Sequence, residues 1–304
     1  MNAADICAII GSIFGILGSI LIIILFVYFG EGKLFYKKLI LILSIYDLSQ
    51  SISYILPGKT DSLVCSIQMY LIGITGLTSQ YWSCSISIIS YLKVVKDRND
   101  KYLEKLYKSL HLLMWILVFF CIVIIAVFGS PTHSDTYWCW CKQKGITGMM
   151  YFFYWTFLVL CLIFYILTVA RLKRNFQKIM KSDSKIPKET QMTQLRIQLR
   201  MTMIPLIYII LLIPSTIKRV HEFIIENPND WISVDVLQSI FITTHGFWDF
   251  LIFIVFNEEM RKKISESCFG SSNNLEFYQI SDFDTIKDFV YSDDEDSRLK
   301  EFIN

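Results

Sequence analysis

The chain has 304 residues, of which 54% are hydrophobic and only 18% carry a charge. A soluble domain of this length carries about a quarter charged residues, and here long apolar blocks alternate with short polar ones, which is typical of a membrane protein. The net charge of +2 gives no indication of nucleic-acid binding.

Seven stretches are long enough to cross a bilayer, which takes about 20 mostly apolar residues. Only five residues precede the first, with no basic region and no small-residue cleavage site, so we predict an uncleaved first span rather than a signal peptide. The second, third and seventh stretches contain polar residues, and such helices face a bundle interior rather than lipid. We therefore predict an all-α membrane protein, a bundle of transmembrane helices at about 6–29, 38–56, 65–92, 109–128, 147–170, 201–223 and 233–256.

Lysine and arginine residues indicate the orientation of these spans, because they are enriched in cytoplasmic loops. They are concentrated in the segments after the first, third, fifth and seventh spans. We therefore expect the N-terminus outside and a multi-pass protein in the plasma membrane. The side expected to be external has only Lys59, Lys142, Lys144, Lys218 and Arg219.

Small residues on the first span predict close helix packing. Gly11 and Gly15 form a G-x-x-x-G pattern, and Gly18 extends the same face. Such a face allows the backbones of two membrane helices to approach each other.

The segment after the seventh span is expected to lie on the inner membrane surface. Apolar residues recur every fourth position within 257–268, between basic residues, which predicts a short amphipathic helix. Cys268 at its end is either a palmitoylation site or a plain cysteine. Residues 269–304 are acidic and predict a disordered cytoplasmic tail. This tail is either merely solvating, or it is phosphorylated by kinases and bound by arrestin-like partners. Its candidate phosphorylation sites are Ser281, Thr285 and Ser292.

Several motifs resemble one family of G-protein-coupled receptors. "THGFWDFLIFIVFN" (244–257) resembles the last span of the cyclic-AMP receptor-like family, the slime-mould chemotaxis receptor type (class E). "YWSCSISIISYLKVVKDRND" (81–100) is similar to its third span, and "YWCWC" (137–141) to its second outer loop. The chain departs from the family at Glu258–Glu259, where Asn-Pro is usual, and at Asp249, where an acid is not expected. The resemblance implies a receptor for cyclic AMP or another secreted signal, coupled to a heterotrimeric G protein.

The two cysteines of "YWCWC" pose a separate question, because they could belong to a metal site, a redox pair or a disulfide. A metal site needs more ligands than His133 alone adds, and a redox pair is normally Cys-x-x-Cys. On the outer side of a membrane disulfides persist, and Cys65 begins the third span on that side. The resemblance implies a Cys65–Cys139 bridge, and Cys141 remains the alternative partner.

Charged residues near the outer ends of the spans are candidates for contact with an anionic ligand. These are Lys142, Lys144, Lys218, Arg219 and His133, and guanidinium is the natural partner of a phosphate group. For Arg219 the alternative is a surface salt bridge with Glu222, which follows it by three residues.

Polar residues deeper in the spans are candidates for the core beneath the ligand. Asp47 and Asp249 lie at similar depths, about 13 Å and about 10 Å from the cytoplasmic ends of their helices. They either share a proton or a cation, as an activation-sensitive site, or bond separately to serine or threonine. His245 and Trp248 lie near mid-membrane and either line this core or serve helix packing.

The inner surface offers basic side chains to a partner. Leu172, Phe176, Ile179 and Met180 share one face of a basic extension of the fifth span, which can contact a partner helix or anionic lipid. The basic residues also serve membrane orientation. The candidates that face a G protein are Lys93, Lys96, Arg98, Arg171, Lys173, Arg174 and Phe176.

Other classes of membrane protein fit the sequence less well. A retinal protein needs a lysine in the last span, and 233–256 has none. The four histidines are scattered, without metal-ligand spacing, so we expect no enzyme, no metal and no cofactor. A polytopic transporter or channel remains the alternative, because polar inner helices also suit a transport pathway.

Overall fold

The computed structural model describes residues 3–29, 35–56, 62–133, 138–181, 188–224 and 232–256, together with residues 260, 261 and 264. The chain divides into two units, 1–256 and 257–304. Of the predicted amphipathic helix at 257–268, only Met260, Arg261 and Ile264 are described, and they are helical. Cys268, Ser281, Thr285, Ser292 and the acidic tail lie outside the described residues.

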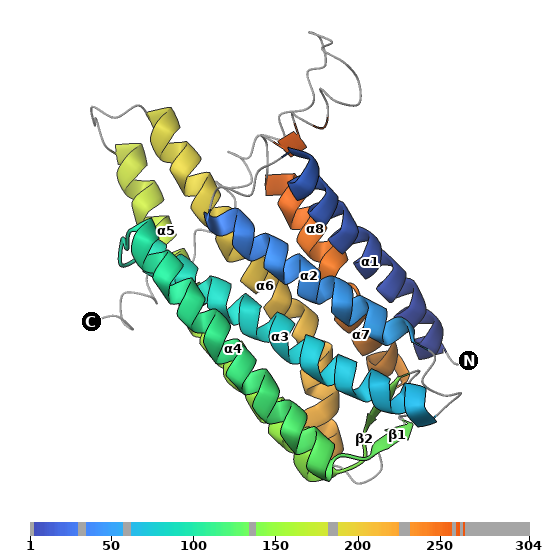
Figure 1. Ribbon diagram of the computed structural model, residues 1–304. Helices are drawn as coiled ribbons and strands as arrows, with labels where there is room; N and C mark the ends of the chain where they lie inside the picture. Colours follow the sequence, from blue (N-terminus) through green and yellow to red (C-terminus); the bar gives the residue numbers. More distant parts are fainter. Residues whose placement is uncertain are drawn as a thin grey trace. The chain divides into compact units, whose positions relative to one another are not determined.

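The first unit is a helix bundle with one short hairpin (Figure 1). The strands are antiparallel, and Thr132 pairs with Trp140. We call the end of the bundle that carries the hairpin the disulfide end, and the end that carries residues 93–100 the basic end. The elements are α1 (Ala3–Phe29), α2 (Phe35–Ile55), α3 (Ser62–Val94), α4 (Asp100–Phe128), β1 (Pro131–His133), β2 (Cys139–Cys141), α5 (Lys144–Lys181), α6 (Lys188–Ile224), α7 (Ile232–Thr243) and α8 (His245–Phe256).

Helix α3 is the centre of the bundle, in contact with α2, α4, α5 and α6. Every residue from Thr75 to Ser87 is buried, and many are serine, threonine or glutamine. Polar side chains are costly next to lipid, so a polar helix is stable only where its neighbours cover it.

Helix α4 is the opposite case. Leu112, Phe119 and Phe128 are each more than 60% exposed, on a helix with strongly apolar composition. Exposed side chains of this kind on a soluble protein would form a large apolar patch, whereas in a bilayer they contact lipid tails.

Four helical segments among the described residues are long and apolar enough to cross a membrane, and the pair α7 and α8 makes a fifth if it is counted as one bent span. Helices α2 and α3 fall short of this test because of their polar residues. The structure therefore supports a membrane bundle, while the count of seven spans stays a prediction. The four segments are Ala3–Tyr28, Asp100–Phe128, Lys144–Gln177 and Thr202–His221.

The predicted seventh span is broken rather than continuous, with a 55° bend between α7 and α8. The hydroxyl of Thr243 donates to the carbonyl of Ser239 (2.7 Å), and that of Thr244 donates to the carbonyl of Ile240 (2.8 Å). Hydroxyls that bond back to the preceding turn compete with the helical ladder and bend helices. The bend places His245 at the start of α8, in the buried interior.

The glycine face of α1 packs against this bend, which confirms the predicted close packing. A Cβ added at Gly15 would collide with the carbonyl oxygen of Thr243, and one at Gly18 would lie 2.5 Å from the Cα of Phe247. Only glycine allows the backbones of α1 and of the α7–α8 bend to approach this closely.

Helix α4 begins earlier than predicted, at Asp100 instead of residue 109. The side chain of Asn99 caps it by accepting a hydrogen bond from the backbone N–H of Tyr102 (2.9 Å). Helices α5 and α6 likewise extend beyond the apolar windows, at the basic end. A hydropathy window finds the part of a helix that suits lipid, and these helices continue past it.

Candidate functional site

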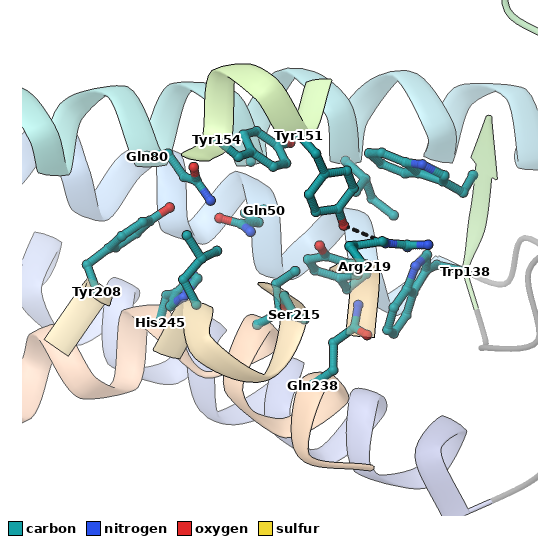
Figure 2. A pocket seen from close by; sticks show the side chains of 16 residues that line it. Gln50, Gln80, Trp138, Tyr151, Tyr154, Tyr208, Ser215, Arg219, Gln238 and His245 are labelled. Atoms are coloured by element: carbon teal, nitrogen blue, oxygen red, sulfur yellow. Dashed lines mark hydrogen bonds between the residues drawn. The ribbon is translucent and has the colours of Figure 1, made fainter. Parts of the chain in front are cut away.

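A cavity lies inside the bundle near the disulfide end (Figure 2). It encloses about 490 Å³ including open solvent, but only about 20 Å³ admits the centre of a water-sized sphere. That room suits a water molecule or two, whereas sites for small molecules measure about 300–1,000 Å³. The side chains are thus drawn together in this conformation. The lining residues are Gln50, Tyr54, Ile72, Gly76, Gln80, Trp138, Trp140, Tyr151, Tyr154, Tyr208, Leu212, Ser215, Arg219, Gln238, Ile242 and His245.

Strand β2 covers the cavity and is fixed by a covalent bond. Cys139 forms a disulfide with Cys65 of α3, with their Cα atoms 5.3 Å apart, which confirms the expected pairing. The backbone N–H of Cys139 also donates to Gln68 (2.9 Å). Cys141 is a free, buried thiol that donates to Gln143 (3.1 Å), so it is not the partner of Cys65 in this structure.

The aromatic rings beside Cys139 form part of the cavity wall. Trp138 packs edge-on against Tyr54 of α2, with ring centroids 5.1 Å apart. Because side chains alternate along an extended segment, Trp138 and Trp140 share one face of the segment 138–141 and the two cysteines share the other. The alternation of "WCWC" therefore has a structural meaning, since one face carries the disulfide and the other faces the cavity.

Arg219 is the one arginine or lysine among the described lining residues. Its Nε donates to the hydroxyl of Tyr151 (2.9 Å), and its guanidinium lies 5.1 Å from the centroid of the same ring. This contact orients the cation toward the cavity (Figure 2). The side chain of Glu222, the alternative partner, lies outside the described residues.

Lys218, the residue before Arg219, points to a different helix. It forms an ion pair with Asp235 of α7, and both side chains are less than a third exposed. Lys218 is absent from the described cavity lining, as is Lys142, which is exposed just after β2.

Several other side chains that line the cavity are polar. His245 is 4% exposed and stacks on the ring of Tyr208, with centroids 4.8 Å apart. Within the described ranges, neither ring nitrogen of His245 has a hydrogen-bond partner. The same holds for the Oε1 atoms of Gln50, Gln80 and Gln238. Buried polar atoms are normally bonded, so this cluster is suited to a polar guest or to water.

Asp47 and Asp249 are neighbours in the interior, where α2 packs against α8. Both are buried, and Asp47 accepts a short hydrogen bond from Ser79 of α3 (2.5 Å). The sequence left two alternatives for these acids, contact with each other or separate hydrogen bonds to serine or threonine. Asp47 has both kinds of neighbour, the serine and the second acid. Trp248 packs against Phe247 and is not among the described lining residues.

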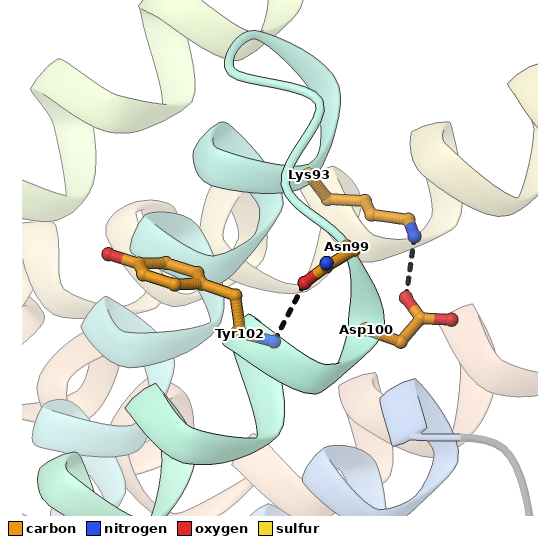
Figure 3. A network of polar contacts seen from close by, with 4 residues as sticks. All are labelled: Lys93, Asn99, Asp100 and Tyr102. Carbon is orange, nitrogen blue, oxygen red and sulfur yellow. Dashed lines mark hydrogen bonds and ion pairs between the residues drawn. The ribbon is translucent and has the colours of Figure 1, made fainter.

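At the basic end, the turn from α3 to α4 has a defined local structure (Figure 3). Lys93 forms an ion pair with Asp100 (2.6 Å), and Asp97 has a positive φ of 49°. The guanidinium of Arg98 lies 5.1 Å from the ring centroid of Tyr102. Lys96 and Arg98 are exposed, so this turn presents cations to the surroundings.

The extension of α5 differs from what the sequence led us to expect. Leu172 and Phe176 are 5% and 2% exposed, so this part of the apolar stripe packs within the chain and does not face a partner in this conformation. Arg174 is exposed, while Arg171 and Lys173 are partly exposed. The side chains of Ile179 and Met180 lie outside the described set.

A family model described as the slime mold cyclic AMP receptor matches residues 1–279. The chain belongs to this family. The match makes the chain a membrane protein of the G-protein-coupled receptor kind.

Curated relatives agree with this assignment. The chain is 27% identical over 215 residues to "G-protein coupled receptor 1" of Arabidopsis thaliana, covering 68% of this chain and 64% of that protein. It is 22% identical to "Cyclic AMP receptor-like protein C" of Dictyostelium discoideum, covering 73% of this chain and 60% of that protein. The chain thus spans less than two thirds of the length of these two relatives. It is 21% identical to "Cyclic AMP receptor-like protein A" of the same organism, covering 94% of this chain and 75% of that protein.

Squid rhodopsin has the same fold. The superposition has a TM-score of 0.67 at 15% identity and covers 94% of this chain and 89% of rhodopsin. At this identity the likeness concerns the fold alone.

In this family member, sequence reasoning found some of the lining residues and missed others. Arg219 and His245 were candidates and line the cavity, but Gln50, Gln80 and Gln238 were not singled out. A signal was available, since an amide within a membrane helix is costly unless it faces an interior. The helices that carry these three amides were predicted to form the inner wall.

Proposed function

We propose that this chain is a G-protein-coupled receptor whose extracellular ligand binds in the cavity at the disulfide end. The observation that carries the proposal is the set of buried, unbonded polar atoms of Gln50, Gln80, Gln238 and His245 around one cavity. A protein whose interior served only packing would gain stability by replacing them with apolar groups. Their presence is understandable if a ligand completes their hydrogen bonds.

The ligand we propose is a small secreted molecule such as cyclic AMP or a related signal. Arg219 would pair with an anionic group, and the rings of Tyr54, Trp138 and Tyr151 would stack on a planar one. The amides that line the cavity would bond to the polar edge of that group. Because the present cavity has room only for water, binding must separate its walls.

The orientation that we propose has the disulfide end outside. The support comes from the lysine and arginine bias of the loops and from the disulfide, which persists in an oxidising environment. The exposed cations Lys96, Arg98 and Arg174 would then face the cytoplasm, where a heterotrimeric G protein binds. Arrestin-like proteins or kinases would act on the tail.

Asp47 and Asp249 would form the activation-sensitive element between the two ends. Two ionised carboxylates at close range in a low-dielectric interior repel each other, so the pair favours holding a proton or a cation. A change in helix packing that separated them would change that preference. We expect Asp249→Asn to alter signalling across pH and sodium concentration, and unchanged signalling would remove this role.

The test of the function is ligand-dependent guanine-nucleotide exchange in membranes that contain the receptor. Cyclic nucleotides and secreted metabolites would be screened against G-protein dissociation in cells, and active compounds tested for exchange. We expect at least one to raise exchange in a receptor-dependent manner. If none does, and the protein instead carries an ion or solute flux, the transporter alternative is correct.

A further inference from the structure

The mouth of the cavity is closed by bonds of two different strengths. On one side, the Cys65–Cys139 disulfide holds β2 to α3 covalently. On the other side, the outer end of α6 is held by side-chain contacts from two consecutive residues. Lys218 pairs with Asp235 of α7, and Arg219 donates to Tyr151 of α5.

The ion pair lies one helical turn from a cavity-lining residue on each of the two helices. Ser215 precedes Lys218 by three residues on α6, and Gln238 follows Asp235 by three residues on α7. Ser215 and Gln238 both line the cavity and are each 1% exposed. Since residues three apart share a helix face, the pair joins α6 to α7 directly above these two residues.

We propose that the Lys218–Asp235 ion pair is the gate of the cavity, and that α6 and α7 separate there to admit the ligand. This inference rests on the proposed function in one respect only, namely that the cavity takes a ligand from the disulfide end. The hairpin cannot move away from α3 without breaking a covalent bond, whereas the ion pair can open and re-form. The bend at Thr244 leaves α7 as a short arm of 12 residues beyond it.

The chemistry of the gate favours anions. Opening releases the ammonium group of Lys218 from Asp235, next to the guanidinium of Arg219, so an incoming anionic group can replace the carboxylate of Asp235. The pair is also only partly shielded from solvent, with side chains 16% and 29% exposed. Its strength must therefore fall as salt rises.

The test is the rate at which a membrane-impermeant maleimide labels Gln238→Cys. The background carries Cys7→Ser and Cys141→Ser, which removes two of the free thiols. Lys144→Cys, exposed at the start of α5, serves as the matched control for reagent access. The assay requires neither a ligand nor a G protein.

We expect slow labelling of Gln238→Cys when the ion pair is intact. Asp235→Asn or Lys218→Gln should each raise the rate about fivefold, the effect of losing one partly exposed pair. The exchanged pair Lys218→Asp with Asp235→Lys should restore slow labelling. The control at Lys144→Cys should be labelled equally in all of these backgrounds.

A salt titration tests the gate without changing the pair, so it remains informative if a substituted receptor fails to reach the membrane. Between about 0.01 M and about 1 M sodium chloride the screening length falls from about 30 Å to about 3 Å. Labelling of Gln238→Cys should rise over this range while that of Lys144→Cys stays constant. Rates that respond neither to salt nor to the substitutions would overturn the gate, but would leave the receptor proposal intact.

Discussion

The cations beside the cavity and those on the surface of the basic end are held in different ways. At the disulfide end, Lys218 and Arg219 are partly buried and fixed by Asp235 and Tyr151. At the basic end, Lys96, Arg98 and Arg174 are exposed. The difference teaches that net charge does not locate a binding site. A few oriented cations in a confined space can select a small molecule, whereas many exposed ones suit a large partner or a lipid surface.

The largest effect in this comparison is expected from the disulfide, which fixes the cover of the cavity. Cys65→Ser or Cys139→Ser should lower the free energy of unfolding by about 2–5 kcal/mol and reduce the amount of folded receptor. Cys141→Ser should change little, since that thiol is free. Thermal unfolding of purified receptor and mobility on non-reducing gels measure both. If Cys141→Ser, rather than Cys139→Ser, abolishes the difference in gel mobility between the reduced and non-reduced receptor, then Cys141 and not Cys139 is the partner of Cys65.

The next largest effect is expected in α1, which packs against the bend between α7 and α8. Gly15→Ala should cost about 1–3 kcal/mol, because the added methyl would collide with the carbonyl oxygen of Thr243. Gly145→Ala is the matched control, since nothing lies within 4 Å of an added Cβ there. Thermal unfolding compares the two, and equal stability would show that the α1 contact is loose.

Oriented and exposed cations should then differ in their effect on ligand response. Tyr151→Phe removes the hydroxyl that fixes Arg219 but keeps the cation and the ring. We expect the ligand concentration for half-maximal exchange to rise about threefold to tenfold, the effect of losing one hydrogen bond to a charged group. Tyr70 is not among the described lining residues, so Tyr70→Phe, the control, should leave this concentration unchanged. A response that Tyr151→Phe does not shift would mean that the orientation of Arg219 is unimportant.

The smallest effect is expected at the basic end. Lys93→Ala removes an ion pair whose side chains are 38% and 74% exposed, and such pairs contribute about 0–1 kcal/mol. Receptor stability and ligand affinity should therefore remain unchanged, while exchange on the G protein weakens. A clear loss of stability would contradict the view that this end is a contact surface rather than part of the packed fold.

Much of this arrangement could be predicted from the sequence because lipid imposes simple rules. Apolar length located the helices, and equal depth brought Asp47 and Asp249 together. The break at Thr244 was missed because hydropathy does not register hydroxyls that bond to the backbone. The partner of Lys218 was missed because Asp235 lies on the next helix, and no spacing along the chain relates the two.

The most direct test of the central claim, that the cavity at the disulfide end binds the ligand, compares Arg219→Gln with Lys142→Gln. Both remove one cation from the same end, but only Arg219 lines the cavity. In guanine-nucleotide exchange with the ligand from the screen, we predict that Arg219→Gln raises the half-maximal concentration about tenfold to hundredfold. Lys142→Gln should match the unsubstituted receptor. An unchanged response in Arg219→Gln, or equal losses in both, would contradict the claim.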